Sequence, residues 1–157
     1  AGPSKTANAP EPKGPTTRVT DVSRDDRSPA EDRVTLRVLV YSDNPGTRRQ
    51  VLGTLDEQLH PYLPDLQLIE VATAPTVLAH LDERTVDLAI LDGEAAPVGG
   101  MGLAKQIRDE YEPCPPLLVL IARRADRWLA DWSRADATAA LPIDPLELPR
   151  TVVDLLR

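Results

Sequence analysis

Apolar residues follow a repeating pattern from residue 34 onwards, in which short branched runs alternate with stretches of helical periodicity. The runs contain little polar alternation, which is typical of strands buried on both faces of a parallel sheet. We expect these strands at residues 36–41, 67–71, 88–91, 117–121 and 139–141.

The stretches between the runs carry apolar residues three and four positions apart, which indicates helices with one buried face. We expect helices around residues 45–59, 74–81, 103–111, 126–135 and 144–156. Asn44 and Pro45 suit the N-cap and first position of the first helix. The last helix is expected to start at Asp144, with Glu147 closing a capping box, although Pro149 predicts an irregular beginning.

The β-α unit thus occurs five times between residues 34 and 157. This order predicts an α/β fold with a doubly wound, five-stranded parallel sheet between two helix layers. Right-handed crossovers and the flavodoxin-like strand order 2-1-3-4-5 are the expected topology. Functional side chains in such a sheet lie at the carboxyl ends of the strands.

Residues 1–33 form a tail of different composition. They contain no Leu, Ile, Met or aromatic residue but five of the 16 prolines. Such a segment buries too little apolar surface to fold alone, so we expect it to be disordered by itself. An inert tail is the simplest interpretation. We favour an extended segment that orders along a partner, with Arg18, Arg24 and Arg27 contacting acidic groups.

The net charge of −7 belongs entirely to residues 34–157, because the tail holds six basic and six acidic residues. An acidic domain argues against nucleic acid as a partner. No apolar stretch is long enough for direct membrane insertion. A single cysteine excludes a disulfide framework and a multi-thiolate metal site, and it suits the cytoplasm.

Acidic residues follow two of the predicted strands. Asp43 comes directly after the first strand, and Asp92 after the third. These strands are neighbours in the expected order, so the two carboxylates should meet and could bind Mg²⁺ weakly. In the alternative interpretation, each aspartate begins a loop or accepts hydrogen bonds from nearby amides.

Five motifs, in this order and spacing, resemble the receiver domain of bacterial response regulators. They are VLVYSDNP (38–45), DLAILD (87–92), PVGGMGL (97–103), PPLLVLIA (115–122) and LPIDPLEL (141–148). The resemblance implies that Asp92 is the phosphoacceptor and that Asp43 is the second of two acidic metal ligands.

Three other positions depart from the family pattern. Ser42 stands where the first metal-binding acid is expected, Ile121 or Ala122 where a Ser or Thr is, and Leu141 where a Lys is. No lysine follows Lys105 in this sequence. Each charged donor lost from a phosphoryl-transfer site costs several kcal/mol of transition-state stabilisation. We therefore expect the receiver fold without its phosphorylation switch, and without tightly bound Mg²⁺ or another cofactor.

Three further features have weaker chemical meaning. The glycine-rich run at 99–102 lacks the lysine and spacing of a phosphate-binding loop, so it predicts a flexible turn. Cys114 lies between two prolines and predicts an unreactive loop thiol. Trp128 and Trp132 share one helix face, where packing is the simpler interpretation and an aromatic anchor for a partner is the other.

Residues 91–103 and 114–121 are similar to orphan receiver-like proteins of mycobacteria whose genes lie beside those of respiratory complex I. This resemblance implies a non-enzymatic accessory or regulatory subunit on the peripheral arm of NADH:quinone oxidoreductase. Its place would be cytoplasmic, at the inner face of the plasma membrane through that complex. The alternatives are a single-domain response regulator phosphorylated on Asp92, and a small Mg²⁺-dependent enzyme using Asp43 and Asp92.

Overall fold

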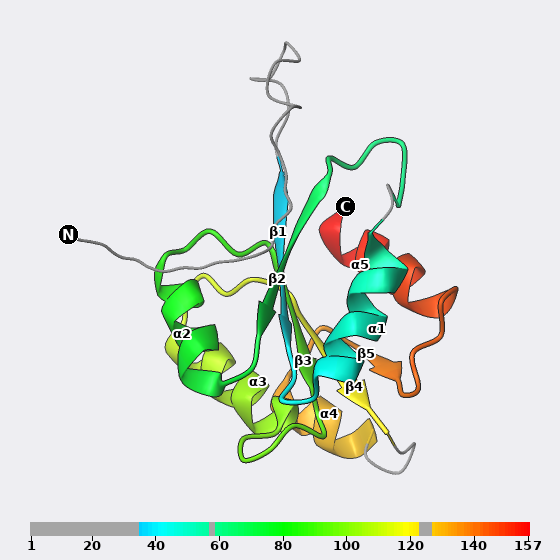
Figure 1. The fold of residues 1–157 in the computed structure, drawn as a ribbon. Helices are drawn as coiled ribbons and strands as arrows, with labels where there is room; N and C mark the ends of the chain where they lie inside the picture. Colours follow the sequence, from blue (N-terminus) through cyan, green and yellow to red (C-terminus); the bar gives the residue numbers. More distant parts are fainter. Residues whose placement is uncertain (1–34, 57–58, 123–126) are drawn as a thin grey trace, which may run out of the picture. The chain divides into compact units, whose positions relative to one another are not determined.

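The strands form one parallel sheet in the order β2-β1-β3-β4-β5, as the sequence predicts (Figure 1). The computed structural model describes residues 35–56, 59–122 and 127–157. Residues 36–157 form one compact unit. The strands are β1 (Leu36–Tyr41), β2 (Leu66–Val71), β3 (Leu88–Asp92), β4 (Leu117–Ile121) and β5 (Ala137–Ala140).

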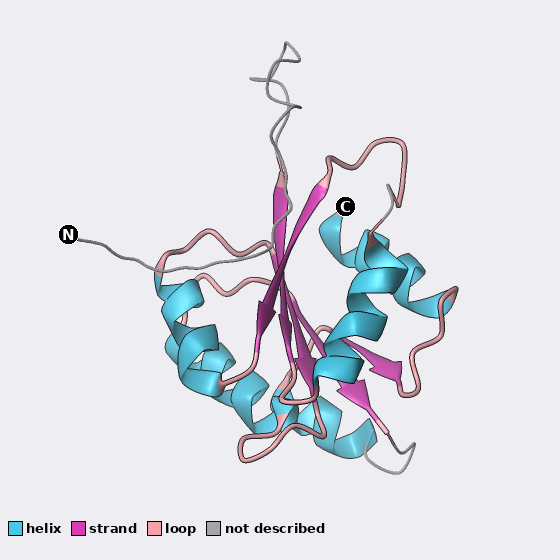
Figure 2. Ribbon diagram, viewed as in Figure 1, coloured by secondary structure: helices cyan, strands magenta, loops and turns pink. Residues whose placement is uncertain are grey.

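Helices cover both faces of this sheet (Figure 2). They are α1 (Pro45–Leu55), α2 (Ala74–Asp82), α3 (Gly100–Glu110), α4 (Arg127–Ser133) and α5 (Glu147–Leu156). Figure 1 shows α2 and α3 on one side of the sheet and α1 and α5 on the other, while α4 packs beside α3.

Two apolar cores result, one on each face of the sheet. Successive residues of β1 alternate between them: Leu39 packs in the core beneath α2 and α3, whereas Val38 and Val40 pack in the core beneath α1 and α5. Every residue of β3 and β4 is buried, whereas the edge strands β2 and β5 are partly exposed. The expectation of burial on both faces is therefore correct for the central strands and wrong at the two edges.

The first helix begins as predicted. The Asn44 side chain accepts a 2.8 Å hydrogen bond from the Gly46 amide, and Pro45 occupies the first turn. Leu59 lies beyond α1, and Tyr111 directly follows α3, so both helices end earlier than their apolar spacing suggested.

The start of the last helix differs from the prediction. The Asp144 carboxylate accepts hydrogen bonds from the amides of Leu146 (2.8 Å) and Glu147 (3.2 Å), which closes a turn before the helix. α5 then begins at Glu147. Pro149 falls in the first helical turn, where a missing amide hydrogen costs little because those amides have no partner within the helix.

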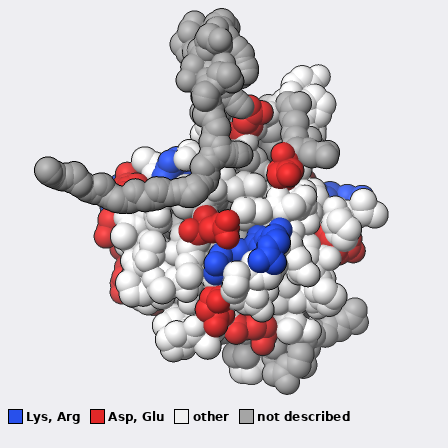
Figure 3. All heavy atoms as spheres, viewed as in Figure 1, with Lys and Arg blue, Asp and Glu red and all other residues white. Residues whose placement is uncertain are grey.

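None of the helices in the described ranges is long and apolar enough to cross a membrane. On the face seen in Figure 3, acidic and basic side chains are interspersed rather than gathered into one basic patch.

Candidate functional site

Ser42 and Asp92 lie opposite each other at the carboxyl edge of the sheet. Tyr41 pairs with Leu91 across β1 and β3, so the next residue of each strand continues the same register. This is the point at which the chain order of the strands reverses, where ligands of doubly wound sheets bind. The predicted location of the site is therefore realised by the fold.

The Ser42 hydroxyl donates a 2.7 Å hydrogen bond to Oδ2 of Asp92. The other carboxylate oxygen, Oδ1, accepts a 2.8 Å bond from the Glu94 amide. Ser42 is fully buried, and Asp92 is only 3% exposed. Both oxygens of the phosphoacceptor-like carboxylate thus have a protein donor in a buried site.

Ser42 is bonded through its backbone as well as its side chain. Its amide donates to the Val71 carbonyl (3.1 Å), and its hydroxyl accepts from the Asn44 amide (3.0 Å). Its carbonyl accepts a 2.6 Å bond from Nη1 of Arg48, whose Nε pairs with Glu70 at 3.0 Å. Every polar group of Ser42 therefore has a partner, which fixes its hydroxyl against Asp92.

Arg48 is the residue near this site that sequence reasoning missed. It lies in the first turn of α1, four residues after the N-cap Asn44, and its amide donates to the Asn44 carbonyl. That position directs its side chain back over the ends of β1 and β2. Its guanidinium is bonded to the Ser42 carbonyl and Glu70, so it does not replace the missing lysine at Asp92.

The loop after β3 is held by close backbone packing. A Cβ atom on Gly93 would lie 2.6 Å from the Leu120 carbonyl oxygen, to which the Gly93 amide donates a 2.8 Å bond. A Cβ on Gly100 would lie 2.8 Å from the carbonyl of Asp92. The prediction of a flexible glycine-rich turn is wrong for Gly100, which brings the first turn of α3 directly onto Asp92.

Tyr41 ties the same loop to β1. Its side chain is buried, and its hydroxyl donates a 2.6 Å hydrogen bond to the Val98 carbonyl. Burial, together with the negative charges of Asp43 and Asp92, raises the pKa of Tyr41. The phenol therefore stays protonated and keeps its role as a donor.

Asp43 lies at the same edge of the sheet but is exposed. The group that bonds Asp92 across the switch point is Ser42 rather than an acid. Within residues 35–56, 59–122 and 127–157, no three His, Cys, Asp or Glu side chains gather in a way that could hold a metal ion.

The other positions that depart from the family pattern present apolar groups. Ile121 is buried at the end of β4, Ala122 is exposed, and Leu141 follows β5 and packs partly into the core. Lys105 pairs with Asp109 at 2.9 Å. Its ammonium also lies 5.9 Å from the centre of a Trp132 ring, so it makes its contacts on α3 and α4.

Trp128 and Trp132 expose 65% and 52% of their surface on α4. The packing interpretation does not account for this exposure, although Lys105 covers part of Trp132. We call these two residues the α4 tryptophan pair. The other predicted partner-binding residues, Arg18, Arg24 and Arg27, lie outside the described residues.

No family model matches the chain. A stretch of 122 residues is 58% identical to an "uncharacterized response regulatory protein" of two Mycobacterium tuberculosis strains, covering 78% of this chain and 92% of the relative. The chain belongs to the response-regulator family. Its receiver domain is a signalling module, and the family relationship agrees with the fold and with the position of Asp92 at the end of β3.

Solved receiver structures show the same fold. A response regulator from Chloroflexus aurantiacus superposes with a TM-score of 0.69 at 19% identity, covering 78% of this chain and 98% of that one. The chemotaxis regulator CheY4 of Vibrio cholerae gives 0.66 at 20% identity, with 78% and 100% covered. The regulator TrrA of Thermotoga maritima, in complex with Mg²⁺ and BeF, gives 0.65 at 25% identity, with 77% and 99% covered.

Proposed function

We propose that this response regulator is a receiver-fold docking subunit that works without phosphorylation. The observation that carries the proposal is the buried hydrogen bond from Ser42 to Asp92, together with the Glu94 amide on the second carboxylate oxygen. These two donors hold the carboxylate in place, and each bond withdraws electron density from the oxygen that would act as the nucleophile.

The chemistry of phosphoryl transfer supports the same conclusion. Transfer to a carboxylate depends on metal ions and cationic donors that neutralise charge on the phosphoryl oxygens. Here a neutral hydroxyl occupies the place of one metal ligand, and Ile121 and Leu141 offer neither a hydroxyl nor a cation. Arg48, whose guanidinium lies at the same edge of the sheet, is already bonded to Glu70 and a backbone carbonyl.

The α4 tryptophan pair supports a docking role. Exposed tryptophans on one helix face are unusual on a free surface, and tryptophan is among the residues that contribute most to binding energy in protein interfaces. The partner we propose is a large protein assembly. The similarity of residues 91–103 and 114–121 to orphan mycobacterial receiver-like proteins favours the peripheral arm of respiratory complex I, at the inner face of the plasma membrane.

Affinity purification of the tagged full chain from native membranes, followed by mass spectrometry, tests this partner. We expect peripheral-arm subunits of complex I in stoichiometric amounts with the wild-type chain, and a loss of them with Trp128→Ala/Trp132→Ala. Tyr62→Ala is the matched control, because Tyr62 is 88% exposed but precedes β2 at the other edge of the sheet. Recovery of a histidine kinase in place of complex I would contradict the proposal.

The second candidate function is a single-domain response regulator phosphorylated on Asp92. The position of Asp92 at the end of β3, at the switch point of the sheet, is the observation that favours it. The two functions differ in one measurable property, the formation of a phosphoryl adduct on Asp92.

A further inference from the structure

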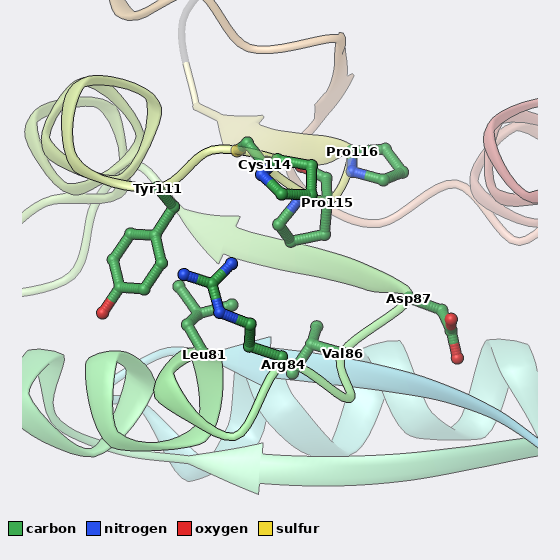
Figure 4. Close-up of a pocket in the computed structure, with 9 residues that line it drawn as sticks. Leu81, Arg84, Val86, Asp87, Tyr111, Cys114, Pro115 and Pro116 are labelled. Atoms are coloured by element: carbon green, nitrogen blue, oxygen red, sulfur yellow. Dashed lines mark hydrogen bonds between the residues drawn. The ribbon is translucent and has the colours of Figure 1, made fainter.

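A cavity of about 290 Å³ opens at the end of the sheet opposite to Asp92 (Figure 4). It lies between the loop that precedes β3 and the loop that precedes β4. These strands are parallel neighbours, so their two incoming loops meet at the same edge. The cavity is therefore separated from the phosphoacceptor-like site by the length of the strands.

Most of the cavity wall is apolar and rigid. Leu81 and Val86 contribute aliphatic surface, and the Tyr111 ring forms one side. Three of its lining residues are the prolines at 113, 115 and 116, whose ring closure fixes the backbone φ angle. A wall of this kind is organised before a ligand arrives, which lowers the entropy lost on binding.

The Arg84 guanidinium is a positive charge within this largely apolar lining. In Figure 4 the Arg84 guanidinium lies between Tyr111 and the loop that carries Cys114. Among the described residues, it has no hydrogen-bond or ion-pair partner. Two neighbouring carboxylates accept hydrogen bonds from other groups. Asp82 accepts from the Tyr111 hydroxyl (2.6 Å), and Asp87 accepts from the Arg37 amide (2.8 Å).

The backbone of Arg84 is in the left-handed region, with a φ of 59°. Its amide donates a 2.9 Å bond to the Leu81 carbonyl as the chain leaves α2. Glycine is the residue that takes this conformation after a helix without a steric cost. An arginine in this conformation carries backbone strain, and strained residues of this kind occur most often at functional sites.

The other titratable groups of the inner wall carry no charge at neutral pH. Burial raises the pKa of the Cys114 thiol. The hydrogen bond to Asp82 raises the pKa of Tyr111 to about 12. Asp87 lies at the rim and points away from the guanidinium in Figure 4. No acid of the lining pairs with Arg84 in the described residues, which leaves its charge available to an anion.

We propose that this cavity binds a small monocarboxylic acid with a compact apolar body. The carboxylate pairs with the Arg84 guanidinium, whose planar donors match a carboxylate in two-point geometry. The apolar body packs against Leu81, Tyr111 and the prolines. The volume lies just below the range for small-molecule pockets, roughly 300–1,000 Å³, which limits the ligand to a small acid. This binding is independent of the function proposed above.

The test is a titration of the ¹⁵N-labelled full chain with phenylacetate, followed by amide chemical shifts. We expect saturable shifts at residues 84, 111 and 114 with a dissociation constant of about 1 mM or below. Phenylacetamide, which has the same body without the charge, should bind at least about tenfold more weakly.

Arg84→Gly separates ligand binding from folding. Glycine takes the left-handed backbone of residue 84 readily, so this variant should fold at least as well as the wild type. It should bind phenylacetate at least about tenfold more weakly, whereas Arg150→Gln, which removes an exposed arginine from α5, should bind it unchanged. The proposal would be overturned if acid and amide bound equally, if Arg84→Gly bound phenylacetate as the wild type does, or if phenylacetate did not bind.

Discussion

The Ser42 hydroxyl and the Asp92 carboxylate are joined by a 2.7 Å hydrogen bond at the buried end of β1 and β3. The family resemblance leads one to expect two acids and a metal ion at this place. Here a neutral donor meets a single acid. The backbone groups of Ser42 bond to Val71 and Arg48, and its hydroxyl also accepts from the Asn44 amide. The bond is therefore part of the hydrogen-bond network of the buried domain. Its removal should lower the free energy of unfolding.

Ser42→Ala should lower the free energy of unfolding by about 1–3 kcal/mol, because it leaves one oxygen of a buried carboxylate and the Asn44 amide without a partner. Urea denaturation followed by circular dichroism measures this loss. Thr151→Ala is the matched control, since it removes a hydroxyl bonded to the Glu147 carbonyl on the exposed face of α5. A loss no larger than that of the control would show that the bond adds nothing to stability.

Gly100→Ala and Gly102→Ala make a matched pair in the first turn of α3. At Gly100 the new methyl group would press on the backbone of Asp92, whereas nothing lies within 4 Å of a Cβ at Gly102. We expect Gly100→Ala to destabilise the domain by about 1–3 kcal/mol, as overpacking does. Gly102→Ala should stabilise it by up to about 1 kcal/mol, because alanine is the better helix former. Equal melting temperatures for the two variants would contradict the close packing described above.

The α4 tryptophan pair should matter for binding and hardly at all for folding. Because both rings are largely exposed, we expect Trp128→Ala/Trp132→Ala to change the free energy of unfolding by less than about 0.5 kcal/mol per substitution. The affinity for the purified partner complex should fall at least tenfold, about 1.4 kcal/mol. Surface plasmon resonance measures the affinity, and an unchanged dissociation constant would move the docking surface elsewhere on the domain.

Deleting residues 1–33 should leave the domain folded but weaken its binding to the partner assembly at least tenfold, about 1.4 kcal/mol. The prolines and the charged residues Arg18, Arg24 and Arg27 suit an extended segment that binds along another protein. A competition assay between the full and the shortened chain measures the difference. If both bind equally well, the tail is only a linker.

The fold could be predicted because most of its strands and helix starts are specified by short, local sequence signals. Buried runs such as those of β3 and β4, and start signals such as Asn44-Pro45, specify elements without knowledge of the rest of the chain. Element ends were harder. The apolar spacing that includes Leu59 and Tyr111 continues past the points where α1 and α3 stop, because both residues pack on the core from outside a helix.

The candidate site was predictable in its position but not in its bonding. Strand order predicted that Asp43 and Asp92 meet at this edge, whereas the register of β1 and β3 sets Ser42 opposite Asp92. Whether Asp92 meets a second acid or a hydroxyl depends on register and side-chain direction, which strand order does not give. Likewise, the role of Gly100 depends on how near the first turn of α3 comes to Asp92, a distance set by tertiary packing.

The most direct test of the account is incubation of the full chain with acetyl phosphate and Mg²⁺, followed by intact-mass measurement. We expect no phosphoryl adduct on the wild-type chain, as on Asp92→Asn. Ser42→Asp/Leu141→Lys, which restores two positions of the family pattern, should gain an Mg²⁺-dependent adduct that is lost on adding Asp92→Asn. A stable adduct on the wild-type chain that disappears in Asp92→Asn would contradict the account and identify a working phosphorylation switch.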